Sequence, residues 1–165
     1  MTIRRFCTAA FLVLALAQPA AAVLQKGQPA PPIKVVSTSG QQISLANYKG
    51  YVLVLDFFAS WCHPCRESIP HLMELNRKYG KQGLQILGMS VDEEVGRELK
   101  NFIAEQKFTY PVALANEELQ AEYGLRSVPT LFVINKKGIV VEKFSGYNEQ
   151  IGRNIEALVK KLLAE

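Results

Sequence analysis

Two cysteines separated by two residues carry the clearest chemistry in this sequence. Cys62 and Cys65 follow Trp61 and enclose His63 and Pro64. The loop that two thiols at this spacing could close is too small to staple a fold, so we interpret them as working thiols. A cysteine at a helix N-terminus faces unpaired N–H groups and the positive end of the helix dipole, which favour the thiolate. We therefore predict a redox pair in which Cys62 is the exposed attacking thiolate and Cys65 the more buried resolving thiol.

The residues around this pair adjust its chemistry. Pro64 lacks an N–H, which costs least in the first turn of a helix. A charged His63 would stabilise the thiolate of Cys62, and a more stable thiolate makes the couple more oxidising. The other histidine, His71, is expected on a solvated helix face.

The third cysteine, Cys7, lies in a segment with the three-part layout of a secretory signal. The first 22 residues have a short basic start, an apolar run over 6–17 and three alanines at 20–22. The run is shorter than the roughly 20 residues of a membrane-spanning helix, although an uncleaved anchor is the alternative. We expect a signal peptide over 1–22 and a periplasmic mature domain over 23–165 without a transmembrane segment.

Length and composition exclude several classes of protein. The 165 residues are 48% hydrophobic and 21% charged, which is close to average for a globular protein and argues against disordered, collagen-like and disulfide-scaffold chains. The length suits one domain. Of 19 basic residues, two lie in the first 22, which leaves 17 against 15 acidic ones, too small an excess for nucleic-acid binding. Two mature cysteines cannot form a paired C-x-x-C zinc site, so we expect no metal or other cofactor.

The apolar pattern predicts the elements that position the thiols. The run over 51–58 is continuously apolar around Asp56 and predicts a strand buried on both faces. Residues 61–79 have helical spacing and stop at Gly80. The remaining pattern predicts a hairpin over 33–36 and 41–45, strands over 84–91, 110–113, 128–134 and 139–144, and helices over 93–106, 117–123 and 148–164. The last two strands are joined by Asn-Lys-Lys-Gly, which predicts a hairpin connection. These elements form a single α/β domain with helices on both faces of a mixed sheet.

Several motifs together resemble one family. They are the Trp-Cys-x-Pro-Cys run after the strand, the lead-in Asn-Tyr-Lys-Gly at 47–50, the segment Gly-Leu-Arg-Ser-Val-Pro-Thr at 124–130, and the helix and strand between Glu93 and Ala113. The chain resembles the thioredoxin superfamily and, from about residue 30 onward, its periplasmic TlpA/ResA-like branch. The resemblance implies a three-layer thioredoxin-like fold, with a central mixed sheet flanked by helices, an N-terminal β-hairpin and a central helix–strand insertion.

The resemblance also assigns roles to individual residues. It implies that Cys62 and Cys65 form the redox disulfide and that Pro129 is cis and packs beside Cys62. The backbone of Val128 would pair with an extended substrate strand, and Trp61 would cover the disulfide.

Asp56 stands six residues before Cys62, where thioredoxins carry a buried acid. On a buried strand its pKa should be raised by desolvation, which suits it to accept the proton of Cys65. A solvated position at the strand end is the alternative. The lysine that partners this acid in thioredoxins is replaced by Gly88. Cytochrome-c-maturation members usually carry Glu three residues after the second cysteine, whereas this chain has Ser68.

The sequence therefore predicts an exported thiol–disulfide oxidoreductase. We expect a reductase of periplasmic protein disulfides, with disulfide- or thiol-bearing partners and a membrane electron-transfer thiol protein as donor. The His63 argument favours an oxidant or isomerase instead. A peroxidase would need a Thr-x-x-Cys site that this chain lacks, and a non-enzymatic Cu(I)-handling module would have no Met-rich or His-rich tract to support it.

Overall fold

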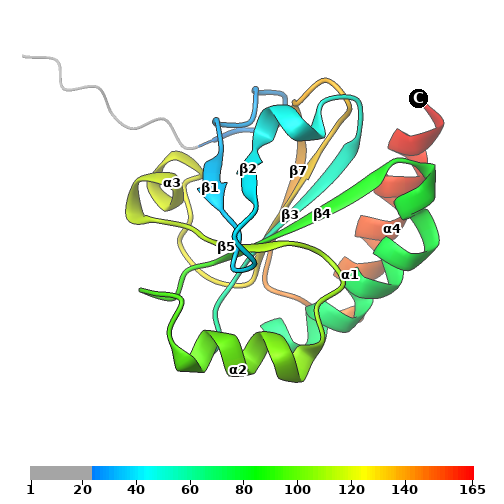
Figure 1. Ribbon diagram of the computed structural model, residues 1–165. Coiled ribbons are helices and arrows are strands. Elements are labelled where there is room, and N and C mark those ends of the chain that lie inside the picture. The colour runs from blue at the N-terminus through cyan, green and yellow to red at the C-terminus, as the bar shows by residue number, and fades with distance from the viewer. Residues whose placement is uncertain (1–23) are drawn as a thin grey trace, which may run out of the picture.

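A five-stranded mixed sheet lies between layers of helices in the computed structural model, which describes residues 24–165 (Figure 1). The predicted signal peptide lies outside these residues. The elements are β1 (Lys34–Val36), β2 (Gln42–Ser44), η1 (Leu45–Tyr48), β3 (Val52–Phe58), α1 (Cys65–Tyr79), η2 (Gly80–Gln82), β4 (Leu84–Ser90), α2 (Arg97–Gln106), β5 (Val112–Leu114), α3 (Glu117–Glu122), β6 (Thr130–Ile134), β7 (Val140–Ser145) and α4 (Glu149–Ala164). None of the helices described in 24–165 is long and apolar enough to cross a membrane.

The order of strands in the main sheet is β5-β4-β3-β6-β7. β3 pairs in parallel with β4 and antiparallel with β6, so Asp56 lies between Gly88 and Leu131. β4 and β5 are also parallel, and β6 and β7 form the antiparallel hairpin that the sequence predicts. β1 and β2 form the predicted N-terminal hairpin as a separate two-stranded sheet. The predicted mixed sheet and hairpin are therefore confirmed.

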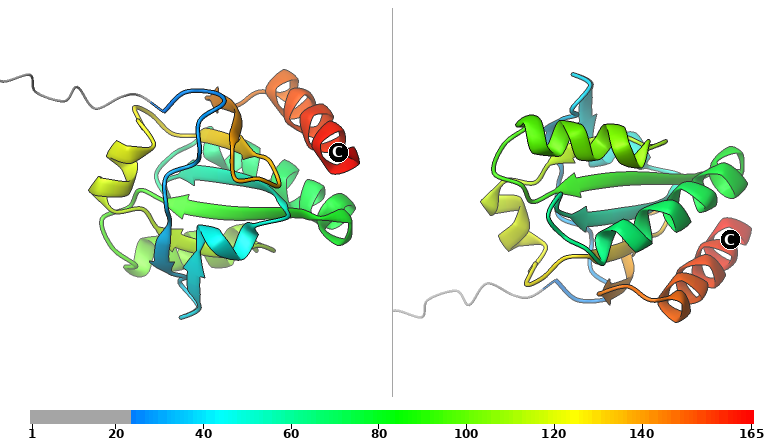
Figure 2. Two further views of the ribbon diagram at one scale, coloured as in Figure 1. Left: turned by 90° about the horizontal axis from the view of Figure 1, so that it is seen from above. Right: turned by 90° about the horizontal axis from the view of Figure 1, so that it is seen from below.

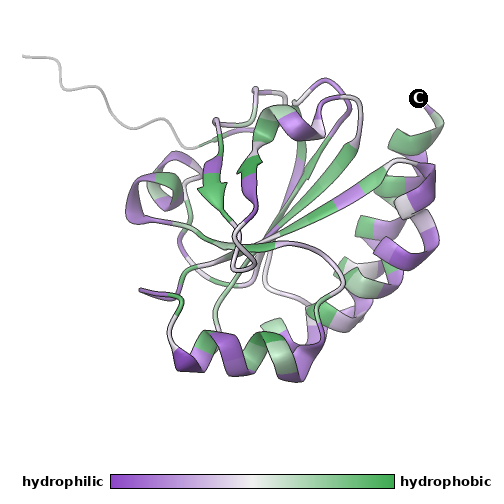
Figure 3. Ribbon diagram, viewed as in Figure 1, coloured by the Kyte–Doolittle hydropathy of each residue, from purple (hydrophilic) through white to green (hydrophobic). Residues whose placement is uncertain are grey.

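The alternating side chains of β3 separate the core into two sides. Val52 and Val54 pack with apolar residues of α1 and α4, and Leu53 and Leu55 pack on the opposite face with the β1–β2 hairpin and α3. Views from above and below show these layers on either side of the sheet (Figure 2). The strands are mostly hydrophobic, whereas the helices alternate hydrophobic and hydrophilic residues (Figure 3). β3 is buried throughout, which explains its continuous apolar run.

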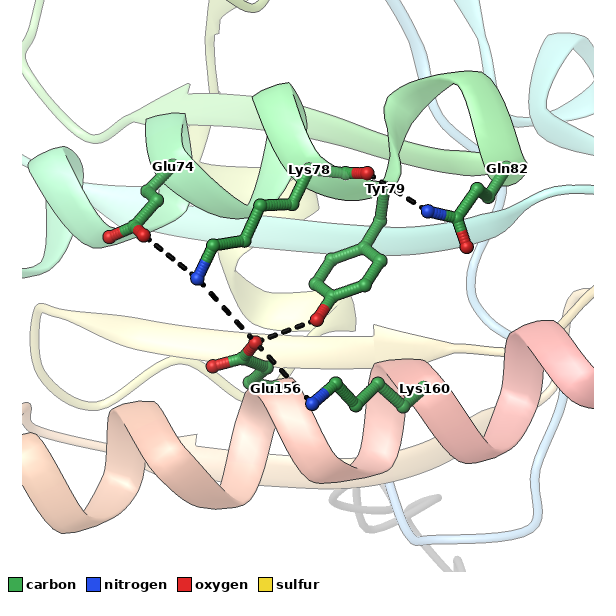
Figure 4. Close-up of polar contacts among 6 residues, drawn as sticks. All are labelled: Glu74, Lys78, Tyr79, Gln82, Glu156 and Lys160. Atoms are coloured by element: carbon green, nitrogen blue, oxygen red, sulfur yellow. Dashed lines mark hydrogen bonds and ion pairs between the residues drawn. The ribbon is translucent and has the colours of Figure 1, made fainter.

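Polar contacts join α1 to α4 at the surface (Figure 4). The Tyr79 hydroxyl donates to Glu156 Oε1 at 2.7 Å, and Lys78 Nζ lies 2.8 Å from Glu74 and 3.8 Å from Glu156. Exposed ion pairs of this kind contribute little to stability. The apolar face of α4 therefore carries most of the packing, through Ile155, Val159 and Leu162.

Two helices begin later than the sequence predicts. α1 begins at Cys65 rather than at residue 61, because residues 61–64 form turns and Pro64 is the N-cap. α2 begins at Arg97 rather than at residue 93, after an extended Gly96. Cys62 consequently lies just before the first turn of α1 rather than inside it.

Candidate active site

The two cysteines form a disulfide immediately beyond the end of β3. Their sulfur atoms are 2.07 Å apart, and their Cα atoms are 5.4 Å apart. Cys62 is 4% exposed and Cys65 is completely buried. Of the two residues, Cys62 is thus the one that an incoming thiol or disulfide can approach, as the predicted order of roles requires.

The start of α1 supplies a hydrogen-bond donor to the first sulfur. The backbone N–H of Cys65 donates to Cys62 Sγ at 3.3 Å. In the reduced protein the same N–H and the positive end of the helix dipole would stabilise a thiolate at this sulfur. His63 and Pro64 are both exposed beside it.

Trp61 and a polar network flank the disulfide. The side chain of Trp61 is 71% exposed and lines a surface hollow with residues 91–94 and 96–99, so its predicted role as a cover for the disulfide stays a prediction. Asp92 accepts hydrogen bonds from the Ser60 N–H at 3.0 Å and the Ser60 hydroxyl at 2.7 Å, and also from the hydroxyl of Ser90. Sequence reasoning missed this network, which ties the turn before Cys62 to the end of β4.

A cis peptide bond joins Val128 to Pro129, as the resemblance implies. Pro129 is buried, and Val128 packs against the apolar cluster that contains both cysteines. Within residues 24–165, the backbone N–H and carbonyl of Val128 form no hydrogen bond. This backbone is therefore available to an extended segment that approaches Cys62.

Asp56 is fully buried on the face of β3 that packs under α1. Desolvation raises the pKa of its carboxyl from 3.8 to about 7, and neither oxygen has a hydrogen-bond partner within 24–165. The alternative of a solvated position at the strand end is therefore wrong. Gly88 lies directly opposite on β4, so no lysine partners this acid.

Gly88 leaves little room for a side chain. A Cβ added there would lie 3.1–3.3 Å from Phe58, Val112 and Tyr110. We expect Gly88→Ala to lower the free energy of unfolding by about 1–2 kcal/mol, because the neighbours must move. Gly80→Ala is the control, since its only close contact is at 3.4 Å and alanine there should be neutral or stabilising. Urea unfolding measures both, and an equally stable Gly88→Ala protein would show that the neighbours yield freely.

The structure also shows the surroundings of Ser68 and His71, two residues of α1 that the sequence analysis discussed. Ser68 is buried, and its hydroxyl donates to the Cys65 carbonyl at 3.0 Å, so the position three residues after the second cysteine faces the core. His71, which was expected on a solvated helix face, is half-buried. Its ring lies against Tyr147, Nδ1 is buried without a partner within 24–165, and burial lowers its pKa.

Metal ligands are not gathered at the disulfide or elsewhere in residues 24–165. No three His, Cys, Asp or Glu side chains of this part of the chain are grouped so that they could hold a metal ion.

The comparisons with known proteins agree with this geometry. The AhpC/TSA family model matches residues 26–143. The thiol-disulfide oxidoreductase ResA of Bacillus thuringiensis (strain Al Hakam) is 34% identical over 140 residues, which cover 84% of this chain and 79% of the relative. The thioredoxin-like protein YneN of Bacillus subtilis is 29% identical over 118 residues, which cover 71% of this chain and 69% of that protein.

Solved structures share the fold. A Chlorobium tepidum protein that carries the name thiol:disulfide interchange protein DsbE superposes with a TM-score of 0.80 at 30% identity, over 85% of this chain and 99% of that one. The fold, the Cys62–Cys65 disulfide and these relatives lead to one conclusion. The chain belongs to the AhpC/TSA family and is a thioredoxin-like thiol–disulfide oxidoreductase of the ResA/DsbE type.

Proposed function

We propose that this enzyme reduces disulfides of exported proteins in the periplasm. The single observation that carries the proposal is the pairing of a slightly exposed Cys62 with a fully buried Cys65, next to the unpaired backbone of Val128. An extended substrate could pair with that backbone and present its disulfide to Cys62. The signal-like composition of residues 1–22 supports the compartment.

The proposed reaction proceeds by two thiol–disulfide exchanges. The Cys62 thiolate attacks one sulfur of the substrate disulfide, forms a mixed disulfide and releases the other substrate sulfur as a thiolate. Cys65 then loses its proton and attacks Cys62 Sγ, which forms the Cys62–Cys65 disulfide and releases the second substrate thiolate. The substrate gains two electrons and the enzyme loses two, so a thiol-bearing donor must reduce the enzyme again. A membrane electron-transfer thiol protein would serve in that role.

Asp56 would accept the proton of Cys65 in the second exchange. It lies on the face of β3 under the helix that begins at Cys65, and its pKa of about 7 leaves it partly ionised at neutral pH. A carboxylate of this pKa can take a proton near pH 7 and return it to solvent.

Equilibration with glutathione tests the direction of electron flow. A reductase should have a potential more negative than about −200 mV, toward the value of about −270 mV that is typical of thioredoxin. It should also reduce insulin with dithiothreitol as donor, and Cys62→Ser, which lacks the attacking thiol, is the control. A potential near about −120 mV, as in strong disulfide oxidants, would reverse the direction that we propose.

His63 is the observation that favours the oxidant alternative. Its side chain is exposed next to Cys62, so solvent screens its charge, and we expect His63→Gln to lower the potential by only roughly 5–20 mV. The sign follows because a charged imidazole stabilises the thiolate of the reduced form and has no thiolate to stabilise in the disulfide.

His71→Gln is the matched control for this measurement. The chain has two histidines, and His71 packs against Tyr147, away from the disulfide. Glutathione equilibration should give the wild-type potential for His71→Gln. An unchanged potential in His63→Gln would mean that the start of α1 alone tunes Cys62.

A further inference from the structure

A buried tyrosine hydroxyl without a partner lies on the same side of the sheet as Asp56. Tyr110 is 7% exposed, and its hydroxyl forms no hydrogen bond within 24–165. The backbone N–H of Gly88 donates to the carbonyl of Pro111 at 2.9 Å, which fixes the segment before β5 against β4. Tyr110 Cε2 would lie 3.3 Å from a Cβ at Gly88, the residue that pairs with Asp56. Gly88 therefore separates two buried polar groups, one on β3 and one in the segment before β5.

No charged side chain of residues 24–165 contributes to the pKa of Asp56. β4 presents Gly88 beside it, and β6 presents Leu131 on its other side. α1 contributes the disulfide residue Cys65 and the apolar Ile69 and Leu72 to this half of the core. The only cause that raises the pKa of Asp56 is desolvation, with no charged neighbour. The charge of Asp56 in turn contributes to raising the pKa of Tyr110, after burial.

We propose that Tyr110 is a positioning residue for the proton acceptor of this enzyme, and that its hydroxyl donates a hydrogen bond to the ionised Asp56, directly or through one water molecule. Three buried oxygens without partners, two on Asp56 and one on Tyr110, would otherwise each carry the cost of desolvation. Burial and the charge of Asp56 hold the pKa of Tyr110 well above 10, so the hydroxyl keeps its proton and stays a donor. Because Gly88 has no side chain, the ring of Tyr110 can approach the position on β4 that pairs with Asp56. The proposal rests on the proposed function of Asp56, although the contact itself can be measured without it.

Tyr110→Phe should raise the pKa of Asp56. A hydrogen bond to the charged form of a carboxyl favours that form, so its loss shifts the equilibrium toward the protonated acid. We expect the titration midpoint of Asp56 to lie about one pH unit higher in Tyr110→Phe than in the wild type. Phenylalanine keeps the ring that packs against Phe108, so the fold should be retained.

Carboxyl-carbon NMR of protein labelled only at aspartate measures this shift directly. The sequence contains two aspartates, Asp56 and Asp92, so two signals are expected, and Asp56→Asn assigns them. Tyr123→Phe is the control, because it also removes a buried hydroxyl, which donates to the Pro31 carbonyl in the core on the opposite face of the sheet. The Asp56 midpoint should move in Tyr110→Phe and stay in Tyr123→Phe. An unmoved midpoint in a folded Tyr110→Phe protein overturns the proposal.

The pH dependence of the resolving step separates this contact from the role of Asp56. If both proposals hold, the pH at which the rate of the second exchange rises is about one unit higher in Tyr110→Phe than in the wild type. When Asp56 is replaced by Asn, adding Tyr110→Phe should no longer change the pH dependence of the rate. If the NMR midpoint moves while Asp56→Asn leaves the rate unchanged, the contact exists and the proton-acceptor role fails. If Asp56→Asn slows the step and the midpoint does not move, the role stands and the contact with Tyr110 is refuted.

Discussion

Cys65→Ser is expected to abolish turnover and to accumulate a covalent adduct through Cys62. Cys65 is completely buried in the first turn of α1, whereas Cys62 retains some exposure, so we expect Cys62 to be the residue that meets a bulky substrate. Without the second thiol, nothing inside the protein attacks the mixed disulfide, which then persists until an external thiol cleaves it. We expect steady-state disulfide reduction to fall at least about a hundredfold, since resolution becomes bimolecular.

Non-reducing mass spectrometry of Cys65→Ser with a disulfide-bonded peptide detects this adduct. Cys62→Ser is the matched variant, because it removes the other sulfur with the same chemical change and should give no adduct. An adduct in Cys62→Ser at the level of Cys65→Ser would reverse the assigned roles of the two cysteines.

Most of the fold can be predicted from the spacing of apolar residues alone. The continuous apolar run of β3 predicted its central, doubly buried position, and the Asn-Lys-Lys-Gly turn predicted the antiparallel β6–β7 pair. The starts of α1 and α2 were predicted four residues too early, because helical spacing of apolar residues continues across turns whose backbone is not helical. The periodicity of apolar residues indicates which side chains face the core, but it does not indicate which backbone groups form the hydrogen bonds of a helix.

The residues of the site could be predicted from the sequence only where the residue type and its spacing indicate one kind of chemistry. Cysteines at this spacing indicate their chemistry directly, whereas the cis bond before Pro129 was implied by the resemblance to thioredoxins. Asp92 and Tyr110 carry no such signal, since their importance depends on which strand ends lie side by side. The half-burial of His71 was not predicted, because Tyr147 and the α4 residue Gly152 approach it only through tertiary contacts.

Asp56→Asn should slow the second exchange most strongly between about pH 7 and 8. Below that range the wild-type carboxyl is already protonated, because its pKa is about 7, and the variant therefore resembles it. Well above that range, solvent deprotonates Cys65 without help. General-base catalysis typically contributes a factor of about 100 or more, so we expect at least a tenfold loss near pH 7.5 in single-turnover reduction of a disulfide peptide. A variant with the wild-type rate at every pH would remove Asp56 from the mechanism.

The same substitution should change the stability of the oxidised protein with a defined sign. The folded-state pKa of Asp56 is about 7, above its ordinary value of 3.8, so between these values the folded protein holds a proton that the unfolded chain has lost. The contribution of the Asp56 carboxyl to the free energy of unfolding is therefore largest below about pH 4. It falls as the pH rises to about 7 and is constant above that, with a total loss of about 4 kcal/mol. The asparagine side chain of the variant cannot ionise, so Asp56→Asn escapes this loss and should be more stable than the wild type at pH 8 by about 2–4 kcal/mol.

Asp92→Asn makes the same chemical change at the other aspartate, but it should lower the free energy of unfolding. Asp92 accepts hydrogen bonds from Ser60 and Ser90, and an amide presents donors to those donors, so about 1–2 kcal/mol should be lost. Urea unfolding of the three proteins at pH 5 and pH 8 separates the effects. The difference between wild type and Asp56→Asn must grow with pH, whereas that for Asp92→Asn should not depend on it in this way. If the Asp56→Asn difference is the same at both pH values, the buried carboxyl does not titrate between them, and the basis for its acting as a base near pH 7 is lost.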